Sequence, residues 1–201
     1  MKPPLRQRKK DQTRAAIVAN AARIFRKKGF EATTLQEIAE ATNIHKQTVL
    51  RYFGSKEEIA FARRIAIFEQ FQADLATYEG STLSFWRAYV EDTASAPDVG
   101  RTLTHWYDFI DTDDRLLAYQ LRLDERFRTA MMRAISREAG LDPGQDVFAA
   151  ALAALLVSGN VTVARMVVRS GDLEDLKPRL LEVVDIAAQL KRPDMRTVKS
   201  A

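Results

Sequence analysis

Apolar residues recur at intervals of three and four along most of the chain, and no stretch alternates convincingly as a strand would. In residues 12–28 this spacing predicts an amphipathic helix that ends at Gly29. Residues 33–56 predict two short helices joined by a tight turn, which together are too small to bury a core alone. We therefore expect the helix over 12–28 to pack against this pair.

The ends of the short helices carry local signals. Thr34 with Glu37 forms a capping-box pattern that begins one helix, and Ser55 with Glu58 begins another. Asn43 stands where the chain must turn sharply, and asparagine tolerates the left-handed conformation better than most residues. These features predict a helix-turn-helix unit whose second helix has the size and polarity that fit a DNA major groove.

The rest of the chain reads as further helices separated by glycine and proline. A helix from Ser55 towards Tyr78 is expected to link the first unit to the remainder without a flexible hinge. We predict an all-α protein of about nine helices, with a DNA-binding domain over 1–56 and an effector-binding and dimerisation domain over 57–201. The first few residues and residues 193–201 are expected to be disordered.

Charge is distributed unevenly along the 201 residues. Residues 1–56 hold 13 lysines and arginines against 4 acidic residues, a net charge of +9. The remaining residues hold 18 against 23, a net charge of −5, so the overall +4 conceals a polarised molecule. A solvated basic tail would also explain the first segment, but its coincidence with a helix-turn-helix pattern favours nucleic acid as the partner.

Composition excludes several classes of protein. The chain has no cysteine, which rules out disulfides, thiol catalysis and cysteine metal sites. Its N-terminus lacks the apolar stretch of a secretory signal, so a cytoplasmic location is expected. The apolar segment 147–168 is interrupted by polar residues, and its unbroken run, 147–157, is shorter than the roughly 18 residues of a membrane span. We expect this helix to be buried or shared with a partner, and no membrane association.

The second helix of the pair, about His45 to Phe53, suggests how DNA would be read. His45, Lys46 and Gln47 should face the groove, with Lys46 and Gln47 the best candidates for base contacts. Phosphate contacts are expected from three side chains and from the amide end of the preceding helix. These positions are Thr48, Tyr52, Lys56 and Thr34. Arg51 completes the helix's DNA-facing set, and the basic leader (Arg6, Arg8, Lys9 and Lys10) is expected to follow the DNA backbone or enter a minor groove. For each residue the alternative is a solvated surface position.

From Thr13 to Ile59 the chain resembles the TetR family of transcriptional regulators. The matching positions are Ile17, Ala21, Ala22, Phe25, Gly29, Phe30, Thr33, Thr34, Ile38, Ala39, Ala41, Ile44, Thr48, Tyr52, Phe53, Ser55, Lys56 and Glu57. The resemblance implies a base contact for Gln36. The family usually has glycine at Asn43 and tyrosine at Leu50, and the second difference removes an implied phosphate contact. Residues 112–127 are similar to the mycofactocin-regulator-like subgroup, which implies an acyl-CoA-like effector.

A single recognition helix binds weakly, so we expect a homodimer on a near-palindromic double-stranded operator. The helix over 144–170 and the last helix are the expected interface, through a four-helix bundle with their symmetry mates. The apolar positions of the last helix are Leu180, Val184, Ala187 and Leu190. The alternative is that both helices fill the core of the protomer.

A cluster of aromatic residues with interleaved polar groups predicts a site for a small, largely apolar effector that releases the DNA. Its candidate residues are Trp86, Tyr89, His105, Trp106, Phe109, Tyr119, Arg122 and Asn160. Aromatic residues at helical spacing are more often part of an ordinary core. The alternatives for His105 and Arg122 are a core histidine and an ion-pair partner.

An enzyme and a helical adaptor protein are the two alternatives to a DNA-binding regulator. An enzyme is disfavoured because the chain has two histidines, no cysteine and neither a phosphate-binding loop nor a metal-binding spacing, so no catalytic residue, metal or cofactor is predicted. An all-α ligand-binding or adaptor protein that does not touch DNA is the second alternative. It does not explain the exposed Lys46 and Gln47 within a segment of charge +9.

Overall fold

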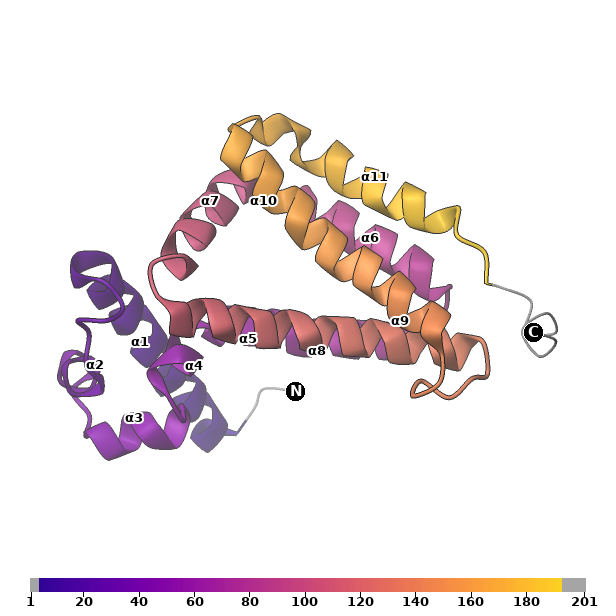
Figure 1. Ribbon diagram of the computed structural model, residues 1–201. Helices are drawn as coiled ribbons and strands as arrows, with labels where there is room; N and C mark the ends of the chain where they lie inside the picture. Colours follow the sequence, from indigo (N-terminus) through magenta and orange to yellow (C-terminus); the bar gives the residue numbers. More distant parts are fainter. Residues whose placement is uncertain (1–3, 193–201) are drawn as a thin grey trace. The chain divides into compact units, whose positions relative to one another are not determined.

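The computed structural model describes residues 4–192, and all the regular structure in that range is helical (Figure 1), which confirms the all-α class. The first helices are α1 (Leu5–Lys28), α2 (Leu35–Thr42), α3 (Lys46–Tyr52), α4 (Lys56–Ala60), α5 (Ala62–Thr77) and α6 (Thr82–Ala94). They are followed by α7 (Val99–Ile110), α8 (Asp114–Glu138), α9 (Val147–Ala154), α10 (Asn160–Ser170) and α11 (Leu176–Ala188). A π-helical turn, η1 (Leu155–Gly159), joins α9 to α10, and a 3₁₀ turn, η2 (Leu173–Asp175), precedes α11. The predicted disorder of 193–201 lies outside the described residues.

The chain forms two compact units. The first unit comprises the described residues up to Glu69 together with Asp111–Tyr119. The second unit comprises Gln70–Ile110 and the described residues from Gln120 onwards. The first unit thus continues past residue 56, although the functional boundary expected there stays a prediction.

The core of the first unit is the meeting of α1, α2 and α3. Ile17, Ile38 and Val49 contribute one side chain from each helix, and all three are fully buried. Phe25 and Phe30 pack with their ring centroids 5.4 Å apart, which closes the end of α1 against the chain that leads into α2. The three-helix arrangement predicted from the apolar spacing is therefore present.

Helix α1 begins earlier than the sequence pattern predicted, at Leu5 instead of residue 12. Arginine, lysine and glutamine favour helix strongly, so the basic leader has a high helical propensity. The Gln7 amide donates to the Asp11 carboxylate at 2.8 Å, one helical turn away, and the Thr13 hydroxyl donates to the Lys9 carbonyl at 2.9 Å. From Leu5 onwards the basic leader is therefore part of α1, and its expected contact with DNA stays a prediction.

Phe71 lies at the centre of an aromatic cluster in the second unit. Its ring centroid is 5.3 Å from that of Phe85, 5.0 Å from Tyr89 and 4.9 Å from Phe127. Helices α6, α10 and α11 run side by side within this unit, as Figure 1 shows. Gly159, the last residue of η1, allows η1 and α11 to approach closely, because a Cβ atom there would lie 3.0 Å from Cγ1 of Val183.

The helical run Val147–Ser170 is continuous, since the π-turn η1 bridges α9 and α10. Among the described residues it is the one helix long and apolar enough to cross a membrane, with a hydropathy of 2.0. The buried helix of a water-soluble protein meets the same test, and its fully buried Ala149, Ala153 and Leu156 belong to the core. The expectation that the chain does not associate with a membrane stays a prediction.

The last helix does not present the apolar stripe that the sequence suggested. Leu180, Val184 and Ala187 are buried within the protomer, with Val184 fully enclosed. Of the four positions named, Leu190 alone is exposed, at 47%, and Ile186 one turn before it is 51% exposed. The expected apolar side chains are buried against α6 and α10. A second protomer could therefore contact α11 only through the opposite face of the helix.

Candidate nucleic-acid interface

The turn between α2 and α3 is built as the sequence predicted. The Thr34 hydroxyl accepts from the Glu37 amide at 3.2 Å, and the Glu37 carboxylate accepts from the Thr34 amide at 2.8 Å, which completes the capping box. Asn43 ends α2 in the left-handed region, with φ of 56°, and the Ile44 amide donates to the Ala39 carbonyl at 3.0 Å. The Ser55 hydroxyl likewise caps α4 by accepting from the Glu58 amide at 3.1 Å.

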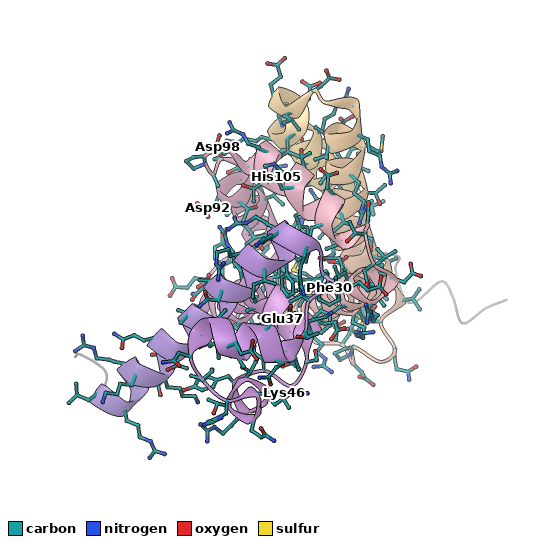
Figure 2. The ribbon with its side chains drawn as sticks, turned by 90° about the vertical axis from the view of Figure 1, so that its left-hand side faces the viewer. Phe30, Glu37, Lys46, Asp92, Asp98 and His105 are labelled. Carbon is teal, nitrogen blue, oxygen red and sulfur yellow. The ribbon has the colours of Figure 1, made fainter. Side chains whose placement is uncertain are left out.

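Helix α3 presents a distinct outer face. Val49 is fully buried and Phe53, which ends the helix, is 2% exposed, so these two side chains anchor α3 to the core. The exposed side chains of the helix are Lys46, Gln47, Leu50 and Arg51, and His45 before it is exposed as well. Figure 2 shows Lys46 at the outer edge of the first unit. Lysine and glutamine at these positions can donate to base edges in a major groove.

Lys56 serves the fold of the first unit. Its ammonium group donates to the carbonyl oxygens of Phe30 at 2.6 Å, Thr33 at 2.8 Å and Glu31 at 3.2 Å. It also lies 4.2 Å from the centroid of the Phe30 ring. Burial, with the nearby Arg115 guanidinium, lowers the pKa of Lys56. All three protons of the ammonium group have acceptors inside the unit, so the predicted phosphate contact would require at least one of these bonds to break.

The start of α2 is already occupied by an acidic side chain. Glu37 accepts from Lys28 and from Thr34, and these partners, Lys28 first, lower the pKa of its carboxyl group to about 2. A phosphate at the expected Thr34 site would meet this carboxylate. Gln36, predicted to contact a base, is exposed and donates to the Glu40 carboxylate at 2.8 Å. These geometries leave both DNA contacts as predictions.

A basic groove lies between the beginning of α1 and the end of α3. It has a volume of about 830 Å³. The residues that line it are Pro4, Arg6, Gln7, Lys9, Lys10, Thr13, Arg51 and Tyr52. The groove brings the basic leader beside two residues predicted on α3, so they form one continuous surface. Thr48, the remaining predicted phosphate contact on α3, is half-buried.

The comparison with known proteins fits this geometry. Residues 17–62 match the family described as bacterial regulatory proteins, tetR family. The HTH-type transcriptional regulator TcmR of Streptomyces glaucescens is 45% identical over 73 residues, which are 36% of this chain and 32% of TcmR. Residues 17–62 are therefore a DNA-binding region of the TetR family. The aligned part spans less than a third of the length of that curated relative, so the match concerns the TetR DNA-binding region.

Solved structures show the TetR fold across nearly the whole chain. GusR of Salmonella enterica has a TM-score of 0.57 at 16% identity, covering 88% of this chain and 94% of GusR. FadR of Thermus thermophilus, a TetR-family repressor in complex with lauroyl-CoA, has a TM-score of 0.52 at 21% identity. That alignment covers 90% of this chain and 97% of FadR. The likeness extends the TetR assignment of the fold from the first unit to the second.

Two of the predicted effector residues are joined by a hydrogen bond in the core of the second unit. The Trp86 indole donates to Oδ1 of Asn160 at 3.2 Å, and the Asn160 amide donates to the Leu180 carbonyl at 2.9 Å. Both side chains are buried. These bonds tie α6 to α10 and α11, so the alternative of an ordinary core describes this pair.

Trp106 also has a partner within the second unit. Its indole donates to the Gln120 side chain at 3.1 Å, and Gln120 donates to the Asp124 carboxylate at 2.6 Å. Phe109 packs beside Trp106, with ring centroids 5.9 Å apart. The sequence predicted Trp106 and Phe109 as effector residues, and the structure shows Gln120 as the buried polar group that orients the Trp106 indole.

The other predicted effector residues are dispersed. His105 and Arg122 are exposed on α7 and α8, so His105 is not a core histidine. Tyr119 belongs to the first unit, where its ring centroid is 4.6 Å from that of Phe61. Tyr89 packs on Phe71 in the second unit. The effector site stays a prediction.

Proposed function

We propose that this TetR-family chain is a ligand-responsive, DNA-binding transcriptional regulator that acts as a repressor in the cytoplasm. The observation that carries the proposal is the outer face of α3. Lys46 and Gln47 project from a helix that Val49 fixes to a closed three-helix core. The surrounding segment has a net charge of +9, which suits a polyanionic duplex.

The division of labour on DNA follows from the positions of these side chains. Lys46 and Gln47 would contact base edges, because they stand on the exposed face of α3 near its beginning. The basic groove between α1 and α3 would hold the sugar–phosphate backbone, which fixes the register of the protein without reading sequence. Lys56 would contribute by holding the turn before α2 in place.

A homodimer would present two copies of α3 to half-sites about 34–36 Å apart on a near-palindromic operator. The second unit offers exposed apolar side chains for such an interface. Val147 and Met166 on the run Val147–Ser170 are 81% and 63% exposed, and Ile186 and Leu190 are exposed at the end of the chain's described part. These side chains replace the buried stripe of α11 as the proposed contact.

A small, largely apolar effector would release the DNA by shifting the population of dimer states. Helices α5 and α8 each contribute residues to both units, which supports a mechanical link between effector and DNA. An effector shifts the equilibrium only by its difference in affinity for the two states. FadR, which shares the fold, was solved with lauroyl-CoA. An acyl-CoA-like molecule is therefore the first effector to test.

The test begins with selection of bound duplexes from a random pool by the full chain, which yields the half-site and its spacing. The variant in which both Lys46→Ala and Gln47→Ala are made should then lose sequence preference and keep its helical circular dichroism. Arg169→Ala, an exposed charge on α10, is the matched control and should bind as the wild type does. Duplex affinity should fall steeply as salt rises. Salt-independent or absent duplex binding would instead favour a helical adaptor.

A further inference from the structure

Leu50 is an exposed apolar side chain in the middle of the polar outer face of α3. It is 41% exposed, although the same helix buries Val49 completely. Each residue of an α-helix advances about 100° around the axis, so positions three and four apart share a face. Leu50 is four residues after Lys46 and three after Gln47, which places it on the same face as both.

The core of the first unit does not account for this placement. Val49 and Phe53 already attach α3 to α1 and α2, and Leu50 points away from that side. Isolated apolar side chains on a surface are common and by themselves carry no meaning. Leu50 differs because the side chains around it, Lys46, Gln47 and Arg51, are polar and belong to the face proposed to enter DNA.

The floor of a major groove contains one apolar group, the C5 methyl of thymine. The polar side chains of α3 match the hydrogen-bonding atoms of bases, and the basic groove beside them matches phosphate. An apolar side chain that enters the groove with them stabilises the complex by covering a methyl group. Attraction between this positively charged surface and DNA brings Leu50 to the bases, so Leu50 itself does not need to attract the duplex.

We propose that Leu50 selects thymine in the operator by packing against the thymine C5 methyl, beside the base pair contacted by Lys46 or Gln47. This inference rests on the proposed DNA-binding function and deepens it. It also follows that Leu50 does not distinguish the methyl group of thymine from that of 5-methylcytosine, since both project from the same ring position into the major groove.

Uracil provides the direct test, because it pairs as thymine does and lacks only the methyl group. In the selected operator, each thymine of the half-site is replaced in turn by uracil, and affinity for the full chain is measured. At one thymine of each half-site we expect a loss of about fourfold, the effect of burying one methyl-sized group. At the same position, a duplex with 5-methylcytosine should bind more tightly than a duplex with cytosine, by a similar factor.

Protein variants connect the effect to Leu50. Leu50→Ala should bind thymine and uracil duplexes with equal affinity at the sensitive position, which is the coupling that a double-mutant cycle detects. Leu50→Gln, which keeps the length of the side chain, should likewise lose the difference in affinity between thymine and uracil duplexes. Leu121→Ala removes a leucine that is 61% exposed in the second unit, and it should retain the full response to uracil.

Sequence-selective binding with no uracil-sensitive thymine would overturn the inference and leave the proposed function standing. The same conclusion would follow if Leu50→Ala kept the wild-type response, because another side chain would then contact the methyl group. Absence of salt-dependent duplex binding by the wild type would overturn both.

Discussion

The guanidinium of Arg192 and the carboxylate of Asp146 form a two-pronged ion pair. The distance from Nη1 to Oδ1 is 2.6 Å and that from Nη2 to Oδ2 is 3.0 Å. Asp146 also caps α9, accepting from the Ala149 amide at 3.1 Å. The Arg192 guanidinium lies 4.7 Å from the centroid of the Phe148 ring. The pair therefore fastens the segment after α11 to the start of the run Val147–Ser170.

This pair predicts a specific loss of stability in acid. Arg192 first, and then the hydrogen bond from the Ala149 amide, lower the pKa of Asp146 from 3.8 to about 2. A carboxyl group with a lowered pKa stabilises the folded state fully above its unfolded value, so the contribution is present above pH 3.8 and lost as pH falls towards 2. Arg192→Gln should lower the free energy of unfolding near neutral pH and leave a smaller dependence on acid. Urea denaturation at several pH values measures both.

Arg179→Gln is the control for that experiment. Arg179 pairs with Glu182 at 3.4 Å on the surface of α11, where both side chains are 59% exposed. Exposed ion pairs contribute little, so this variant should follow the wild-type acid profile. An unchanged acid dependence in Arg192→Gln would show that other carboxyl groups set the profile.

Lys56 should separate stability from DNA binding. Lys56→Met leaves the carbonyl oxygens of Phe30, Glu31 and Thr33 without their cationic donor. Loss of hydrogen bonds to a charged group should lower the free energy of unfolding by about 1–3 kcal/mol. Lys46→Ala changes an exposed side chain, so its stability should match the wild type while its duplex affinity falls. Equal stability of Lys56→Met and wild type would exclude a structural role for Lys56.

The basic groove should contribute affinity that does not depend on sequence. Lys9→Ala and Lys10→Ala each remove one cation from its lining. Each should weaken binding to operator and nonspecific duplex by the same factor and reduce the slope of log affinity against log salt by about one. Arg101→Ala, on α7, should leave the slope unchanged. A variant that changed the preferred sequence would place the lost cation at a base edge.

Two residues on α11 should distinguish the interface from the core. Ile186→Glu places a charge on a side chain that is 51% exposed, and it should yield folded monomers if this face joins two protomers. Val184→Glu buries a charge at a fully enclosed position and should prevent folding. Sedimentation velocity and circular dichroism separate these outcomes. A folded dimer of Ile186→Glu would move the interface away from α11.

Features set by neighbouring residues were predictable from sequence. The capping bonds join Thr34 to Glu37, and the bond that closes the turn at the left-handed Asn43 joins positions five residues apart. Each feature has a characteristic residue type. The earlier start of α1 was missed because the leader was read for its charge. Its arginine, lysine and glutamine side chains were also a helix signal.

Features that depend on distant contacts were not predictable. Lys56 reaches carbonyl oxygens 23 to 26 positions earlier in the chain, and nothing local distinguishes this lysine from one on a DNA-binding surface. Trp86 and Asn160 are 74 positions apart, so the hydrogen bond between these two effector candidates appears only in the folded unit. The buried side of α11 has the same origin, since apolar spacing does not identify the neighbour that covers it.

The π-turn Leu155–Gly159 is a place where the run Val147–Ser170 can differ in length by one residue. A π-turn accommodates one more residue than a regular α-helical turn does. Leu156 within the turn and Asn160 directly after it are both buried, so the same face of the helix packs into the core on either side of the turn. Deletion of one residue in this turn would convert it to regular helix and spare the packing at both ends. Relatives whose sequences differ by one residue here can therefore keep the same bundle, and sequence alignments should allow a gap at this turn.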